Sequence, residues 1–72
     1  MEATDSQLER IFSLIERFAK MRERSLTDVT LALLNSDTLA RYGYDGKSQL
    51  TPEQADIAAG ILEVWIRKAS AL

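Results

Sequence analysis

The segment from Thr51 to Ser70 constrains the fold most strongly, because it is apolar around most of a helical circumference. It opens on Thr-Pro-Glu-Gln, in which Thr51 suits an N-cap, Pro52 the first helical position and Gln54 a capping box. The polar positions that follow fall on one narrow strip: Glu53, Asp56, Gly60, Glu63, Arg67 and Ser70. A helix with this pattern needs protein on most of its sides. We therefore predict a helix over residues 52–70 at the centre of the fold.

Two positions on this predicted helix stand out. Trp65 lies between Val64 and Ile66, and the apolar surroundings predict that it belongs to the core. Gly60 interrupts the helix interior, where glycine costs about 1 kcal/mol relative to alanine. Either Gly60 is tolerated on the polar strip, or it lets another helix approach closely. The sequence leaves both interpretations open.

A second amphipathic helix is predicted over residues 7–24. Its apolar residues recur at intervals of three and four: Leu8, Ile11, Phe12, Ile15, Phe18 and Ala19. Two overlapping capping boxes, Thr4 with Gln7 and Ser6 with Glu9, mark its start. Acidic residues lead and basic residues follow, which suits the helix dipole. Residues 1–5 are expected to fray ahead of the helix.

The apolar stripe of this helix is wider than one packing neighbour requires, because Leu14 and Met21 lie beside it. One explanation is that the helix packs on two neighbours within a single chain. The other is that one flank meets a second copy of the protein. On the second explanation we predict a homodimer whose interface contains Ile11, Leu14, Ile15, Phe18 and Met21.

The segment between these helices contains a further helical region. Val29, Leu33 and Leu34 supply an apolar face, and Thr27 is predicted as its N-cap, with Leu26 and Leu31 forming a hydrophobic staple. Residues 35–37, Asn-Ser-Asp, favour caps and turns. We predict a helix over 27–35 and a short helical turn over 37–42, with one unbroken helix over 28–42 as the alternative.

The whole chain is therefore expected to be an all-α protein, a small three- to four-helix bundle forming a single domain over residues 1–72. With 72 residues it is near the size at which one core is only marginally sufficient. It contains no cysteine and no histidine, which excludes disulfides and the usual zinc, copper and iron ligand sets. We predict no metal site and no cofactor.

The stretch between the last two predicted helices contains Asp45-Gly46, which invites comparison with a calcium loop. If Gly46 were the invariant glycine of an EF-hand loop, the position of the bidentate glutamate would be occupied by Pro52. The sequence therefore does not fit an EF-hand. Gly43 instead suits a helix C-cap of positive φ. Arg41, Tyr42 and Tyr44 surround this turn and are predicted partner-binding residues. The alternative is that both tyrosines cover the ends of the helices.

No catalytic constellation is recognisable, and an enzyme is not expected. We predict a protein–protein interaction module: a regulator, an inhibitor or anti-activator, or a chaperone-like adaptor bound to a larger protein, by analogy with small acidic helical proteins of bacteria and phages. The alternatives are a nucleic-acid-associated regulator, disfavoured by the net charge of −2, and a structural subunit. The acidic N-terminus and the lack of a long apolar run predict a cytoplasmic protein outside the membrane.

Overall fold

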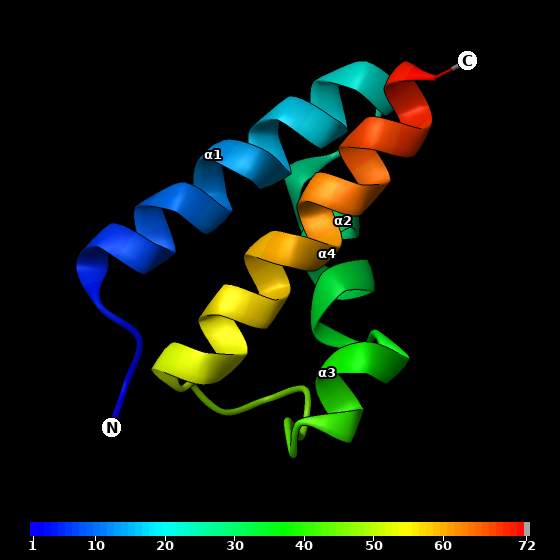
Figure 1. Ribbon diagram of the computed structural model, residues 1–72. Coiled ribbons are helices and arrows are strands. Elements are labelled where there is room, and N and C mark those ends of the chain that lie inside the picture. The colour runs from blue at the N-terminus through cyan, green and yellow to red at the C-terminus, as the bar shows by residue number, and fades with distance from the viewer. Residues whose placement is uncertain (72) are drawn as a thin grey trace.

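The fold is built from helices joined by two short connections and one longer loop over residues 42–51 (Figure 1). The structure is a computed structural model that describes residues 1–71, so the last residue of the domain predicted over residues 1–72 lies outside the described part. Within that range there are four helices: α1 (Asp5–Arg22), α2 (Leu26–Leu34), α3 (Asp37–Arg41) and α4 (Pro52–Ser70). The predicted all-α class, with three principal helices and a short fourth, is confirmed.

Helices α1 and α4 lie side by side and run in the same direction (Figure 1). Near their starts, Nε2 of Gln7 donates to the carbonyl of Pro52 at 3.0 Å. Near their ends, the ring centroids of Phe18 and Trp65 are 5.5 Å apart. The intervening α2 and α3 return the chain to the starting end. The C-terminal halves of the two long helices therefore meet at one end of the molecule.

A single hydrophobic cluster joins all four helices. Its fully buried side chains of largest volume are Leu33, Leu39, Leu62 and Val29. Ala55, Ala58 and Ala59 of α4 are also buried, so α4 presents a small-residue surface on which the other helices pack closely. Helix α4 contacts α1, α2 and α3. The central position predicted for residues 52–70 is thereby confirmed.

The two long helices begin at capping boxes. At α4, the Thr51 hydroxyl accepts from the backbone N–H of Gln54 at 3.1 Å, and Gln54 Oε1 accepts from the N–H of Thr51 at 3.0 Å, as predicted. At α1 the cap is Thr4 rather than Ser6. Residues 1–5, expected to fray, include Ala3, whose N–H donates to the Leu50 carbonyl at 2.8 Å. This contact ties the start of α1 to the loop before α4.

The first helix ends earlier than its pattern predicted. Glu23 has φ 53° and ψ 45°, and its N–H donates to carbonyls of the last helical turn. A left-handed residue at this position stops an α-helix and satisfies its free carbonyls. The helix thus ends at Arg22, and Arg24 lies in the connection to α2 instead of on α1.

The middle of the chain forms two helices, with the break at the predicted Asn-Ser-Asp stretch. The N-cap of α2 is Ser25, whose hydroxyl accepts from the N–H of Asp28 at 3.0 Å, so the predicted Thr27 cap is wrong. Leu26 then becomes the first helical residue. The predicted staple is also wrong, because Leu26 and Leu31 are each 52% exposed.

Gly60 lies on the exposed side of α4. A Cβ atom built at this position meets no atom within 4 Å. No other helix of residues 1–71 therefore uses Gly60 for a close crossing, and its place on the polar strip explains its tolerance. None of the helices in this range combines the length and the apolar character needed to cross a membrane.

Candidate functional site

The loop between α3 and α4 places Tyr44 inside the fold. Its side chain is 8% exposed and belongs to the core cluster, and its hydroxyl donates to the Ser48 carbonyl at 2.7 Å. Burial raises the pKa of Tyr44, and the neighbouring Asp45 carboxylate adds to the effect. Tyr44 therefore covers the helix ends, which was the alternative to its predicted role as a partner-binding residue. Buried in this way, it is not available as an anchor.

The same loop is closed by Asp45. Its Oδ1 accepts hydrogen bonds from the N–H groups of Lys47 and Ser48, each at 2.8 Å, and from the Ser48 hydroxyl at 2.9 Å. Because these bonds favour the charged carboxylate, they lower the pKa of Asp45 to about 2. Gly43 and Gly46, at φ 84° and 83°, supply the left-handed turns. The loop is thus an internally satisfied connection, as the turn interpretation predicted.

The other two predicted partner-binding residues remain at the surface. Tyr42 is 47% exposed and Arg41 is exposed. The Tyr42 carbonyl accepts from Nε2 of the buried Gln54 at 3.0 Å, so its backbone is held while its ring faces outward. The structure brings Arg41 and Tyr42 together at the end of α3 and separates them from Tyr44.

The predicted dimer residues of α1 divide into two groups. Ile11 and Ile15 are buried in the core of the chain itself and have no free surface for a second copy. Leu14 and Phe18 are partly buried against this core, while Met21 is exposed. The wide stripe is explained by the contacts of α1 with both α4 and α2. Packing on two neighbours within one chain was the alternative that the sequence left open.

A groove of about 360 Å³ lies at the end where the two long helices finish. The groove is open to solvent, and the residues that line it come from α1, the α1–α2 connection, α2 and α4: Phe18, Arg22, Arg24, Ala32, Trp65, Lys68 and Ala69. Trp65, predicted as core, is only partly buried. Its ring packs on Phe18 with an angle of 42° between the two planes. The groove therefore combines aromatic and alanine surface with three cations.

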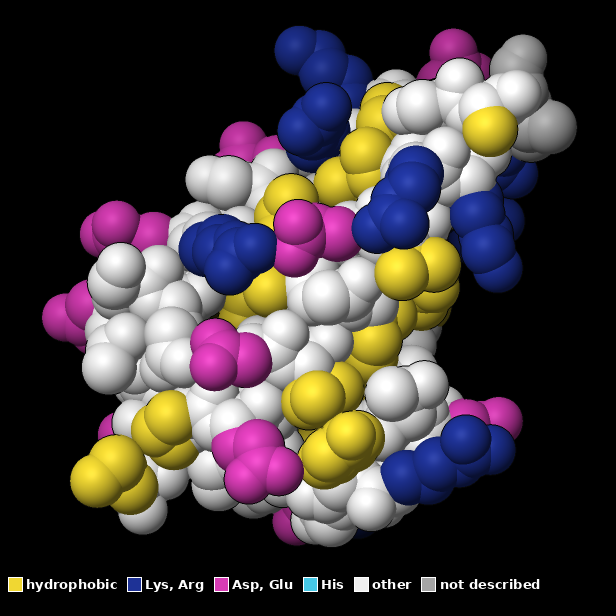
Figure 2. Space-filling view, viewed as in Figure 1, with side chains coloured by type: hydrophobic (Ala, Val, Ile, Leu, Met, Phe, Trp, Pro, Cys, Tyr) yellow, Lys and Arg dark blue, Asp and Glu magenta, His cyan; other side chains and the backbone are white. Residues whose placement is uncertain are grey.

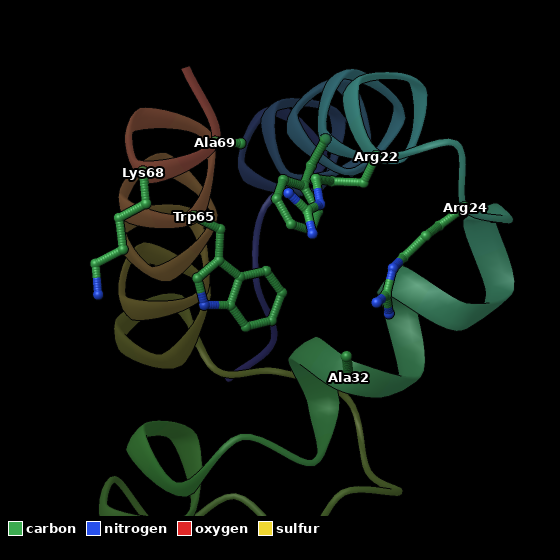
Figure 3. Close-up of a pocket in the computed structure, with 7 residues that line it drawn as sticks. Arg22, Arg24, Ala32, Trp65, Lys68 and Ala69 are labelled. Atoms are coloured by element: carbon green, nitrogen blue, oxygen red, sulfur yellow. The ribbon is translucent and has the colours of Figure 1, made fainter. Parts of the chain in front are cut away.

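Figure 3 shows how these side chains are directed. The Trp65 indole extends from α4 into the space between the helices, above Ala32 on α2. The guanidinium group of Arg22 enters the same space from α1, and that of Arg24 enters it from the connection between α1 and α2. Lys68 points away along the outer side of α4. Arg24 thus lies across the groove from Trp65, Arg22 comes from the same helix as Phe18, and Lys68 contributes charge at the rim.

Basic residues concentrate around this end of the protein. Six of the nine lysines and arginines belong to two short segments, residues 17–24 and residues 67–68, which the parallel arrangement of α1 and α4 brings together. The space-filling view shows basic side chains gathered toward the upper end and acidic ones mainly toward the left and bottom (Figure 2). Although the net charge is −2, the electrostatic character of the groove is therefore locally positive.

The cations of the groove have no internal partner among residues 1–71. The one ion pair in this range joins Arg10 to Glu63 at 2.7 Å, outside the groove. No acidic side chain lines the groove. In the same range, no group of three acidic side chains is close enough to hold a metal ion. The arrangement is suited to holding an apolar group beside anionic ones.

The sequence indicates several residues of this groove, but it does not predict that they lie together. The basic run that ends α1 was interpreted as a dipole partner, and Trp65 as core. Their meeting depends on the parallel order of α1 and α4, which periodicity does not reveal. No known protein-family model matches this chain, and neither a curated protein nor a solved structure is significantly similar to it.

Proposed function

We propose that this protein is a small non-catalytic binding module that acts by occupying the surface of a larger protein, as a regulator, an inhibitor or anti-activator, or an adaptor. One observation carries the proposal: the open groove in which Phe18 and Trp65 meet Arg22 and Arg24. Tryptophan and arginine are enriched among the residues that dominate binding energy at protein interfaces. Such a groove would receive side chains of a partner.

The chemistry of the groove supports binding over a purely structural role. Its volume, about 360 Å³, is near the lower end of ligand pockets, which span roughly 300–1,000 Å³. That space suits one or two large side chains rather than a whole domain. Ala32 and Ala69 keep the walls low. A partner that fills the groove would bury aromatic surface that this chain leaves in water.

Site-specific photocrosslinking tests the proposal. A photoreactive amino acid at Ala32, in the wall of the groove, is compared with the same residue at Ala40, which is exposed on α3. In nuclease-treated lysate of the source cells, we expect a discrete protein adduct from position 32 that is absent from position 40. The control variant Met21→Lys changes a residue of α1 that does not line the groove, and it should retain the adduct. No adduct from position 32, or equal adducts from both, contradicts the proposal.

A nucleic-acid-associated role is the second candidate, favoured by the basic end of the molecule. An aromatic ring among cations is also the composition of single-strand binding surfaces. Against it, Glu16, Glu23 and Asp28 are interleaved with the basic residues. The nuclease treatment separates the two candidates, since an adduct that depends on nucleic acid would disappear.

Self-association is a further proposal, now restricted to the outer flank of α1. It is supported by the exposure of Met21 and by Leu14, which is only partly buried beside it. If two copies pair there, Met21→Glu should convert a dimer to a monomer in light scattering without unfolding the chain. A wild-type protein that is monomeric up to millimolar concentration contradicts the proposal. A cytoplasmic location is part of the proposal and is supported by the lack of cysteine, which suits a reducing compartment.

A further inference from the structure

We infer that the groove binds an acidic peptide segment of a partner protein, in which a bulky apolar side chain is flanked by aspartate or glutamate. The inference rests on the proposed function and adds the chemistry of the partner. The apolar side chain would lie against Phe18 and Trp65, and the flanking carboxylates would pair with Arg22 and Arg24.

The apolar part of the inference follows from the walls of the groove. Phe18 and Trp65 pack on each other through tilted rings and remain partly exposed. The opposite wall is Ala32 of α2, which is too short to reach across and cover them (Figure 3). An inserted side chain would contact two aromatic surfaces at once. A bulky apolar group gains most from such a position.

The anionic part follows from two guanidinium groups without a counterion. Arg22 and Arg24 direct their guanidinium groups into the groove (Figure 3), and neither forms an ion pair within residues 1–71. Arginine binds carboxylate through two parallel hydrogen bonds, which are stronger than hydrogen bonds between neutral groups because both partners are charged. Because Arg22 and Arg24 enter the groove from different segments, carboxylates on both sides of an apolar anchor are favoured.

The helix dipole explains only part of this positive charge. Arg22 and Lys68 lie in the last turns of α1 and α4, where cations offset the partial negative charge of the helix end. Arg24 is different, because α1 has already ended at Arg22. Its position in the connection and its direction into the groove are not required by either dipole. An external anion gives it a partner.

A second copy of the chain is the competing occupant. The N-terminal segment of the protein is acidic and carries a fully exposed Met1, so one copy could insert it into the groove of the next. Such a contact is heterologous: each molecule would use two different surfaces, and the contacts would continue into open chains unless a ring closed. We therefore assign the groove to a different protein, and chain formation is an outcome that the test detects.

A displayed library of random 16-residue peptides tests the chemistry directly. The full-length protein is used for selection, and the double variant Arg22→Glu/Arg24→Glu for counter-selection. We expect the enriched peptides to share one aromatic or leucine residue with acidic residues on both sides. The control variant Lys47→Glu removes a cation on the loop remote from the groove and should enrich the same peptides.

The affinity of an enriched peptide without tryptophan is then followed by fluorescence of Trp65, the single tryptophan of the chain. Binding should shift Trp65 emission and weaken at least tenfold in Arg22→Glu/Arg24→Glu. A matched peptide with lysine in place of each acidic residue should show the reverse preference and bind the double variant better. Circular dichroism confirms that both proteins are folded. A twenty-nucleotide oligothymidine is titrated in parallel.

The outcomes are separable. Enrichment of neutral or basic peptides, no enrichment that depends on the arginines, or a Trp65 response to oligothymidine alone overturns this inference. Concentration-dependent growth into chains, abolished by Arg22→Glu/Arg24→Glu, assigns the groove to a second copy and overturns it as well. If the groove crosslinks a protein in lysate but selects no acidic peptide, the proposed function stands and the inference fails. If no groove-dependent protein adduct forms, the proposed function fails first.

Discussion

The loop over residues 42–50 and the groove at the opposite end each combine aromatic and charged side chains, but the charged groups differ in whether they have a partner within the chain. In the loop, the Tyr44 hydroxyl and the Asp45 carboxylate find their partners within the loop itself. In the groove, Arg22 and Arg24 find none within residues 1–71. Satisfied polar groups indicate a region that serves the fold. Cations without an ion-pair partner beside partly exposed aromatic rings are the basis of our proposal that the groove binds a partner.

The contrast shows where residue type alone misleads. A tyrosine beside a flexible glycine has the composition of an interface anchor, yet Tyr44 is buried. A tryptophan between two branched apolar residues has the pattern of a core position, yet Trp65 lines a groove. In each position the deciding information is the direction of a side chain relative to distant helices.

The largest expected effect is on Tyr44. Tyr44→Ala removes a buried ring and its hydrogen bond to Ser48, and should lower the free energy of unfolding by about 3 kcal/mol. Tyr42→Ala, at an exposed ring two residues away, should change it by less than about 0.5 kcal/mol. Urea unfolding followed by circular dichroism compares the two. Equal losses would remove the distinction between the buried and the exposed tyrosine.

A more stable variant of the protein would allow the groove and the loop to be compared without unfolding. Gly60→Ala places a methyl group where nothing lies within 4 Å and should raise the free energy of unfolding by about 1 kcal/mol. The groove is left untouched, so binding by the folded protein should be unchanged. Groove variants made in this background can then be compared without loss of fold. Destabilisation by Gly60→Ala would mean that another surface, such as a second chain, approaches this glycine.

The groove cations should contribute little to stability. Arg22→Ala/Arg24→Ala removes side chains that have no ion-pair partner, so only a helix-dipole contribution of about 0.5 kcal/mol is expected to be lost. Thermal melting measures this. A loss of unfolding free energy as large as that of Tyr44→Ala would show that the arginines hold the helices together. The groove would then serve the fold, as the loop does.

The smallest effect concerns acid. Because the pKa of Asp45 is lowered to about 2 in the folded chain, its charged form contributes stability that is present near neutral pH and lost as the pH falls through about 2. Asp45→Asn should therefore weaken the dependence of melting temperature on pH between pH 4 and pH 2. An unchanged pH dependence would show that the carboxylate does not hold the loop closed.

Local signals in the sequence were sufficient for the elements but not for the site. Thr51 and Gln54 form the predicted cap because a capping box needs only neighbouring residues. The break near Asn35 was equally local. Thr27 was predicted as the N-cap of α2, but the cap is Ser25, because α2 begins two residues earlier than that prediction required. The groove depends on Phe18 meeting Trp65, a contact that no local rule predicts.

The parallel order of α1 and α4 has a consequence for how the protein forms. The hydrogen bonds between the two helices join residues 45 to 53 positions apart, whereas a helical hairpin would join near neighbours. These separations require a long loop to close before the two helices meet, so folding is expected to be slower than for a helical hairpin of equal stability. During translation, α1 leaves the ribosome before α4 and remains without its packing partner until α4 follows. Until then its apolar stripe is uncovered, and any early-binding partner would meet the chain in that interval.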